Sequence, residues 1–240
     1  MTRGLIQLPL GSNRANEITF RPATQPTDME GTPVTVDDVR EVGSDTVALE
    51  LETPNDFDAL PGQFVLLRAA PEGEEVARHY TLSSPTVAET FELTVGIDPD
   101  GDLSPWLADL EGGETVHVEG PFGTITYEGD GEVVAIAGGP GVGPAVSIAE
   151  AAQEAGHDAV VIYQDDDPAH EDRLEALEAS GVAVYVLAAD ANDELADAIA
   201  SHVDDGQVYA FGFADFVTGV TETIEDAGGD PDDALIENFG

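Results

Sequence analysis

The stretch EVVAIAGGPGVGPAVSI, Glu132–Ile148, decides the fold of this chain. It begins with a continuous apolar run, which is typical of a parallel strand buried on both faces. A turn rich in glycine and proline follows, and a helical pattern starts near Pro144. The spacing Gly139-x-Gly141-x-x-Pro144, with Gly143 inside it, lets backbone amides and the helix dipole face a pyrophosphate. The alternative is a tight turn that binds no ligand, but its place after a first strand favours a nucleotide.

The sequence after this stretch keeps alternating between buried strands and helices. The expected strands are DAVVIYQ, VAVYVLAA and GQVYAFGF, and the expected helices are PAVSIAEAAQEAG, HEDRLEALEASG, ANDELADAIASHV and FVTGVTETIEDAGG. Such alternation indicates a doubly wound parallel sheet with helices on both faces. We therefore expect residues 131–240 to form an α/β domain that binds NAD(P).

The sequence before this stretch has the pattern of an all-β domain. Six or seven short strands are expected, in TPVTVDDVREV, TVALELET, GQFVLLRAA, RHYTLSS, TFELTVGI, ETVHVEG and GTITYEG. Strands at this spacing, separated by turns, suggest a closed or Greek-key β-barrel over residues 32–128. One helix interrupts them in DGDLSPWLADLEGG, where Ser104 stands in the N-cap place and Pro105 at the first helical position.

The charge of the chain restricts its partners. The formal net charge is -43, and seven arginines are its only cations, because lysine is absent. This composition resembles that of proteins from extreme halophiles, in which high salt screens the repulsion between carboxylates. Nucleic acid and anionic membranes are poor partners for such a surface, since binding to them relies on Lys and Arg.

Three further features of the composition bear on location and chemistry. Without cysteine, the chain has no thiolate nucleophile, disulfide or cysteine-ligated metal cluster. Its apolar runs are too short for a membrane helix and no signal-peptide pattern is present, so we expect a cytoplasmic protein. Residues 1–31 lack a sustained period and suggest a disordered extension; the first 28 carry three of the arginines.

The segment RHYTLSSP, Arg78–Pro85, resembles the Arg-x-Tyr-Ser/Thr-x-x-Ser motif of the ferredoxin-NADP reductase superfamily. PGQFVLL upstream and GDLSPWLADLEGGETVHVEGPFG and GGPGVGP downstream follow in the order and spacing of that superfamily. The resemblance runs from about residue 32 to 240. Four motifs in register are far more specific than any one of them alone.

The resemblance implies a site for FAD on the barrel. Arg78 would pair with the FAD pyrophosphate, for which a planar guanidinium is well suited. Tyr80 would stack on the isoalloxazine, and the Thr81 hydroxyl would lie near the flavin N5 edge, where hydride arrives. The further residues that the resemblance assigns to the flavin are Ser84, Gly101, Leu103 and Ser104. A structural salt bridge is the alternative role for Arg78.

Two segments depart from the pattern of the superfamily. Many members have Cys-Gly-Pro at the nicotinamide site, where this chain has Phe211 in place of the cysteine, then Gly212 and Phe213. The resemblance places Phe211, with Tyr80 and Thr81, at the reacting atoms. Plant-type members end in an aromatic residue that covers the flavin, and Phe239 is the nearest candidate here; it could equally be a core residue.

These observations predict an FAD-dependent oxidoreductase that passes hydride from NAD(P)H to flavin and electrons on to a ferredoxin or another redox protein. NADH is favoured over NADPH, because Asp165, Asp166 and Asp167 follow the second strand and would repel a 2'-phosphate. Arg173 could instead reach back to that phosphate. We expect no metal at DDDPAHED, which is more often a solvated loop. The alternatives are a subunit that works only within a larger redox complex and an NAD(P)H:flavin reductase.

Overall fold

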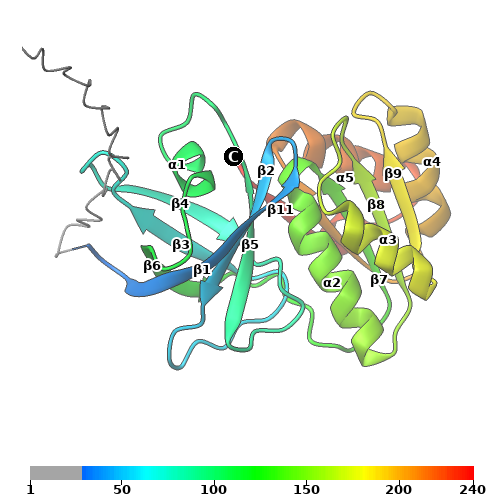
Figure 1. The fold of residues 1–240 in the computed structure, drawn as a ribbon. Coiled ribbons are helices and arrows are strands. Elements are labelled where there is room, and N and C mark those ends of the chain that lie inside the picture. Colours follow the sequence, from blue (N-terminus) through cyan, green and yellow to red (C-terminus); the bar gives the residue numbers. More distant parts are fainter. Residues whose placement is uncertain (1–28) are drawn as a thin grey trace, which may run out of the picture.

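The computed structural model describes residues 29–240, which form two halves built around one sheet each (Figure 1). The first half has six antiparallel strands, β1 (Thr32–Gly43), β2 (Thr46–Glu52), β3 (Phe64–Ala69), β4 (Val76–Thr81), β5 (Thr90–Gly96) and β6 (Thr115–Phe122). The predicted extension, residues 1–31, lies outside the described residues except for residues 29–31, which lead into β1.

The six strands form the predicted barrel. Their order is β4-β3-β6-β1-β2-β5, so β6 lies between β3 and β1 rather than beside β5, as Greek-key connections require. A bridge between Leu82 and Leu93 joins the two edge strands and closes the sheet. In β3 the side chains of Val65, Leu67 and Ala69 alternate into the barrel core, as expected for a strand buried on one face.

One strand expected in this half is absent. The alternating pattern of GTITYEG, residues 123–129, predicted a strand, but the segment is irregular and connects the two halves. Its apolar residues have another use, because Ile125 and Tyr127 pack into the core of the second half. The Tyr127 amide donates a hydrogen bond to the carbonyl of Pro61, which ties the connection to the barrel.

The second half is the predicted doubly wound sheet. Its five parallel strands are β7 (Val133–Gly138), β8 (Ala159–Gln164), β9 (Ala183–Leu187), β10 (Gln207–Gly212) and β11 (Leu235–Asn238), in the order β11-β10-β7-β8-β9. All six residues of β7 and of β8 are buried, which explains their continuous apolar sequence. The sequence did not predict β11, which pairs with β10 beside the barrel.

Four helices cover the two faces of this sheet. One face packs against α2 (Val142–Ala155) and α3 (Glu171–Ser180), and the other against α4 (Asn192–His202) and α5 (Ala214–Asp226). The direction of the strand order changes between β7 and β10, so the sheet opens there at the carboxyl ends of its strands. Ligands of doubly wound sheets bind at such a point. Here it faces the barrel (Figure 1).

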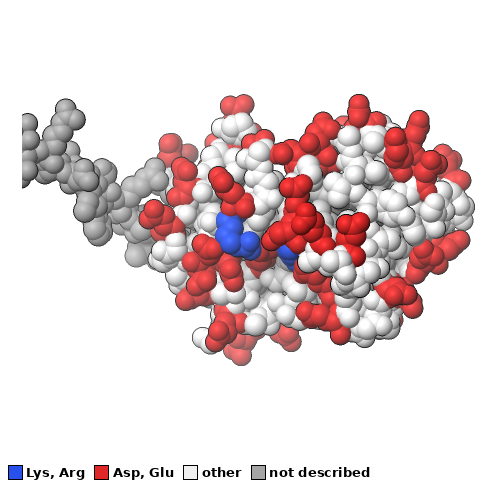
Figure 2. All heavy atoms as spheres, turned by 45° about the vertical axis from the view of Figure 1, so that its right-hand side comes forward, with Lys and Arg blue, Asp and Glu red and all other residues white. Residues whose placement is uncertain are grey.

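Acidic side chains dominate the surface. On the face shown in Figure 2 they extend over both halves, whereas the basic atoms occupy a small area near the middle. Between residues 29 and 240, no helix has the length and apolar character needed to cross a membrane.

Candidate flavin and nicotinamide site

A cavity of about 1000 Å³ lies between the two halves. Its walls come from β4, the loop that precedes α1 (Ser104–Ala108), the glycine-rich turn after β7 and the C-terminal strand β11. Eight residues assigned from the sequence line it: Arg78, Tyr80, Thr81, Gly101, Leu103, Ser104, Pro144 and Phe239. The structure thus brings together the barrel motif and the glycine-rich turn, which are more than 50 residues apart in the sequence.

Arg78 is the cation of this cavity. Its exposed guanidinium donates a hydrogen bond to the carbonyl of Ala77 at 2.8 Å and makes no salt bridge with any carboxylate of residues 29–240. The other arginines described, Arg40, Arg68 and Arg173, all form salt bridges. A guanidinium that has no acidic partner within the described part of so acidic a chain is available to bind an anion in the cavity.

Tyr80 and Thr81 follow Arg78 at the end of β4. Because side chains alternate along a strand, Arg78 and Tyr80 share one face. Tyr80 packs at the edge of the barrel core, and burial raises the pKa of its phenol to about 12, so the ring stays neutral. The buried Thr81 hydroxyl donates a hydrogen bond to the Glu237 carboxylate at 3.2 Å. A charged group, a flat ring and a hydroxyl therefore meet one cavity in sequence order.

Glu237 was not identified from the sequence. It lies in β11, lines the cavity, and has its pKa raised to about 7 by burial, a rise that the hydrogen bond from Thr81 partly offsets. Such a carboxyl can hold or release a proton near neutral pH. No sequence signal distinguished it, because it is one of fifty acidic residues in the chain.

The loop before α1 differs in one detail from the expectation. Ser104 is the first residue of α1, not its N-cap, which is Leu103. The Ser104 hydroxyl accepts a hydrogen bond from the Asp98 amide at 3.0 Å, and the Gly101 amide donates to the Asp98 carbonyl. Leu103 buries its side chain in the barrel core. These contacts hold the loop against the cavity.

The glycines of the turn after β7 are required by packing. Gly139 has a positive φ of 57°, which favours glycine. A Cβ on Gly141 would overlap the carbonyl oxygen of Phe211, and one on Gly143 would overlap the hydroxyls of Ser83 and Thr94 in the barrel. None of the three lines the cavity, whereas Pro140 and Pro144 do. Their expected contact with a nucleotide stays a prediction.

The aromatic residue that reaches the cavity after β10 is Phe213 and not Phe211. The Phe211 ring is fully buried in the core between the sheet and α2, so it cannot meet a ligand. Phe213 is 54% exposed, lines the cavity, and meets Phe239 edge to face with ring centroids 6.0 Å apart. Gly212, which lies between Phe211 and Phe213 in the sequence, leaves room for the Phe216 ring.

Ser84 and most of the acidic loop, which were expected to face the cofactors, do not line the cavity. The Ser84 hydroxyl accepts a hydrogen bond from the Glu92 amide, and its carbonyl accepts one from Ser147 in α2, so Ser84 braces the two halves outside the cavity. In the acidic loop, only Asp165 lines the cavity. Asp166 accepts from the Ala189 amide, and Asp167 accepts from Ser44.

Comparisons with known proteins agree with this architecture. Residues 33–127 match the family model described as the oxidoreductase FAD-binding domain. A glycine betaine monooxygenase reductase subunit from Chromohalobacter salexigens is 41% identical over 108 residues, which cover 43% of this chain and 29% of that protein. An NADH-cytochrome b5 reductase 1 from Emericella nidulans is 39% identical over 107 residues, or 42% and 34% of the two chains.

A solved structure matches almost the whole of this chain. The ferredoxin NADP+ reductase of Neisseria gonorrhoeae, with bound FAD and NADP, superposes with a TM-score of 0.74 at 20% identity. The match covers 87% of this chain and 98% of that one. By contrast, the matched part spans less than a third of the length of the first curated relatives.

Fold and site together define a class of architecture in which an antiparallel barrel is followed by a doubly wound parallel sheet, with a cavity between them. Residues 33–127 are similar to the oxidoreductase FAD-binding domain, and the chain as a whole has the fold of the ferredoxin NADP+ reductase structure. The residues present suit FAD, because a cavity of this size is large enough for a dinucleotide and Arg78 offers it a cation that pairs with no carboxylate of residues 29–240.

Proposed function

We propose that this chain is an FAD-dependent reductase that takes electrons from NADH and delivers them to a protein acceptor. One observation carries the proposal: within residues 29–240, the only arginine without a salt bridge lies beside Tyr80 and Thr81 in a cavity shared by both halves. When bound, FAD supplies the redox chemistry, since it accepts a hydride from a nicotinamide and can release electrons singly or in pairs.

The residues of the chain bind and orient the two ring systems. Arg78 would hold the diphosphate, and Tyr80 would offer its face to the flavin ring. Thr81 and Glu237 form a hydrogen-bonded pair in the cavity, where the raised pKa lets Glu237 keep a proton near neutral pH; this pair would lie near the reacting edge of the flavin. Phe213 and Phe239 line the cavity and meet edge to face, and they would cover bound ring systems and shield them from water.

NADH is the nucleotide that the charges favour. Asp165 is the acidic residue at the end of β8 that lines the cavity, and a carboxylate there accepts a hydrogen bond from a ribose hydroxyl but repels a 2'-phosphate. Arg173, the cation that could have bound this phosphate, pairs with Glu150 and Glu92. Cytochrome b5 reductases that use NADH are among the relatives.

The acceptor we propose is a redox protein. Relatives are named as a monooxygenase reductase subunit and as a cytochrome b5 reductase, and both names imply a protein partner. This supports an electron-transfer subunit over a reductase of free flavin. The expected adaptation to high salt and the cytoplasmic location stay predictions.

A visible spectrum tests the proposed function. The purified protein, in multimolar salt with added FAD and after removal of unbound flavin, should be yellow and should bleach when NADH is added without oxygen. A protein that retains no flavin, or retains it without bleaching by NADH or NADPH, would contradict the proposal. The rates with the two nucleotides test the preference for NADH.

A further inference from the structure

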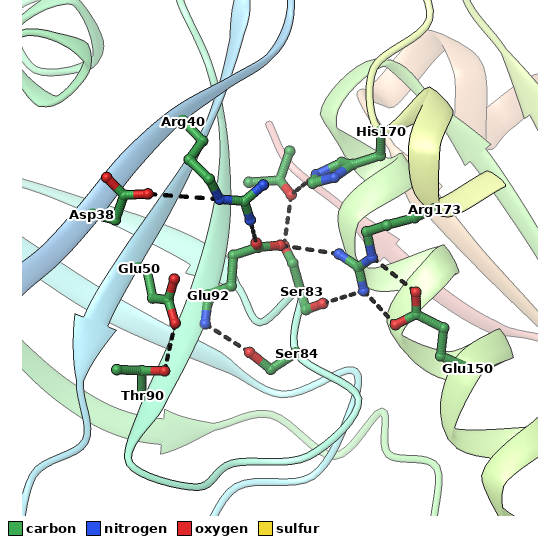
Figure 3. A network of polar contacts seen from close by, with 11 residues as sticks. Asp38, Arg40, Glu50, Ser83, Ser84, Thr90, Glu92, Glu150, His170 and Arg173 are labelled. Carbon is green, nitrogen blue, oxygen red and sulfur yellow. Dashed lines mark hydrogen bonds and ion pairs between the residues drawn. The ribbon is translucent and has the colours of Figure 1, made fainter. Parts of the chain in front are cut away.

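The two halves are joined by a group of charged residues outside the cavity (Figure 3). Arg173 in α3 donates two hydrogen bonds to the Glu150 carboxylate in α2, at 2.9 and 2.6 Å. It donates two more across to the barrel, to the Glu92 carboxylate at 3.0 Å and to the Ser83 carbonyl at 2.8 Å. We call Arg173, Glu150 and Glu92 the interdomain clamp.

The clamp is shielded from solvent. The side chains of Arg173, Glu150 and Glu92 are 17%, 25% and 13% exposed. Burial raises the pKa of Glu92 despite the lowering by Arg173 and Arg40, and the carboxylates keep Arg173 charged. Because desolvation offsets most of the attraction, such a group adds little stability compared with apolar residues of the same volume, although the removal of one partner leaves an uncompensated buried charge.

A second group of polar contacts lies next to the clamp. The Ser83 and Thr94 hydroxyls are 2.6 Å apart in the barrel, and Thr94 is 2.8 Å from Nε2 of His170, which precedes α3. Gly143 of α2 packs directly on these two hydroxyls. Ser83, whose carbonyl accepts a hydrogen bond from Arg173, lies only two residues after Thr81, which lines the cavity.

We propose that Arg173 is a positioning residue, which fixes the nucleotide half against the flavin half and so sets the approach of the nicotinamide to the flavin. This inference rests on the function proposed above. Arg173 binds Glu150 of α2, and the first turn of this helix lines the cavity with Pro144. The same guanidinium donates a hydrogen bond to the Ser83 carbonyl, two residues after Thr81. A shift of about 1 Å in such a geometry can slow a transfer step about 100-fold.

Arg40 provides a matched control. It pairs with the same Glu92 carboxylate at 2.6 Å, but it lies in β1, so this contact stays inside the barrel. Arg40→Gln and Arg173→Gln remove the same charge from the same carboxylate. An effect that comes only from the lost charge beside Glu92 would appear in both variants. A change in the position of one half relative to the other would appear only in Arg173→Gln.

The first measurement is the limiting rate of flavin reduction by NADH in FAD-saturated protein, followed by stopped flow. Arg173→Gln should lower this rate at least tenfold, with the Kd for FAD within twofold of wild type. Arg173→Lys should recover part of the rate, and Arg40→Gln should stay within twofold of wild type. A limiting rate in Arg173→Gln within twofold of wild type would overturn the proposal.

The second measurement needs no flavin. Because the chain has no cysteine, Glu72→Cys and Glu178→Cys place unique spin labels on an exposed site of each half. The distance distribution between the labels should broaden in Arg173→Gln and not in Arg40→Gln; an unchanged distribution would overturn the clamp. If NADH does not reduce the flavin of the wild-type protein, the proposed function fails. The distance between the labels still tests whether the clamp fixes the two halves.

Glu150→Gln covers the case in which Arg173→Gln does not fold. It weakens one end of the clamp and leaves the contacts of Arg173 with Glu92 and Ser83 in place. We then expect an intermediate rate and a moderately broadened distribution. Values of both within the error of wild type would overturn the proposal.

Discussion

Replacement of Arg78 by alanine should weaken FAD binding and leave the fold intact. Arg78 is exposed and has no acidic partner in residues 29–240, so its loss removes no salt bridge from the described part of the chain. A charge-assisted hydrogen bond to a diphosphate contributes about 1.5–3 kcal/mol. The Kd for FAD should therefore rise roughly 10- to 150-fold. Because Arg78 is exposed and salt screens its charge, the lower end applies in multimolar salt.

The assay is a titration of flavin-free protein with FAD, followed by quenching of flavin fluorescence, in the same salt for every variant. Arg68→Ala is the control, because Arg68 lies on the adjacent strand and pairs with Glu119 at 2.6 Å and Glu75 at 2.8 Å. That variant should lose thermal stability and keep its Kd for FAD. If Arg78→Ala bound FAD within twofold of wild type, the role assigned to Arg78 would be wrong.

Three further predictions concern residues in the site or packed next to it. Burial raises the pKa of Glu237 to about 7 from 4.5, so this carboxyl destabilises the fold increasingly as pH rises from 4.5 through 7. Glu237→Gln should therefore match the wild-type Tm near pH 4.5 and exceed it at pH 8; a Tm difference independent of pH would contradict this. Gly143→Ala should cost about 1–3 kcal/mol of unfolding free energy in denaturant titrations, because its Cβ would overlap Ser83 and Thr94; an unchanged midpoint would refute the close packing. Asp165→Asn should raise kcat/KM for NADPH relative to NADH by roughly tenfold, on the order of 1.4 kcal/mol, and an unchanged ratio would show that Asp165 does not face the 2'-position.

The strands and helices with strong patterns were predictable from the sequence. The continuous apolar runs of β7 and β8 and the alternation in β3 each report how many faces are buried. Two segments were predicted wrongly: a strand was expected over residues 123–129, and β11 was not expected. Residues 123–129 alternate because Ile125 and Tyr127 pack into a core from an unpaired segment. By contrast, β11 is a four-residue strand at the edge of its sheet, and it depends on pairing with the distant β10.

The barrel side of the site was more predictable than the nucleotide side. Arg78, Tyr80 and Thr81 belong to one short motif, and the resemblance to the ferredoxin-NADP reductase superfamily already assigned them to one site. Strand alternation then places Arg78 and Tyr80 on the same face. Phe211 and Phe213 flank Gly212 at the end of a strand, and the sequence does not say which ring faces the core. That choice depends on how α2 packs over β10. The partners Glu237 and Arg173 act over long sequence separations, where no local pattern exists.

The contact of Gly143 with Ser83 and Thr94 limits how the two halves can be recombined. A chimera that joined this barrel to the nucleotide half of another reductase would bring a foreign first helical turn onto those hydroxyls. Any side chain larger than hydrogen at that position would push the grafted half away, even when each half folds well alone. A productive graft would have to carry the glycine and a matching pair of small hydroxyl residues together, so the unit of exchange is larger than either sheet.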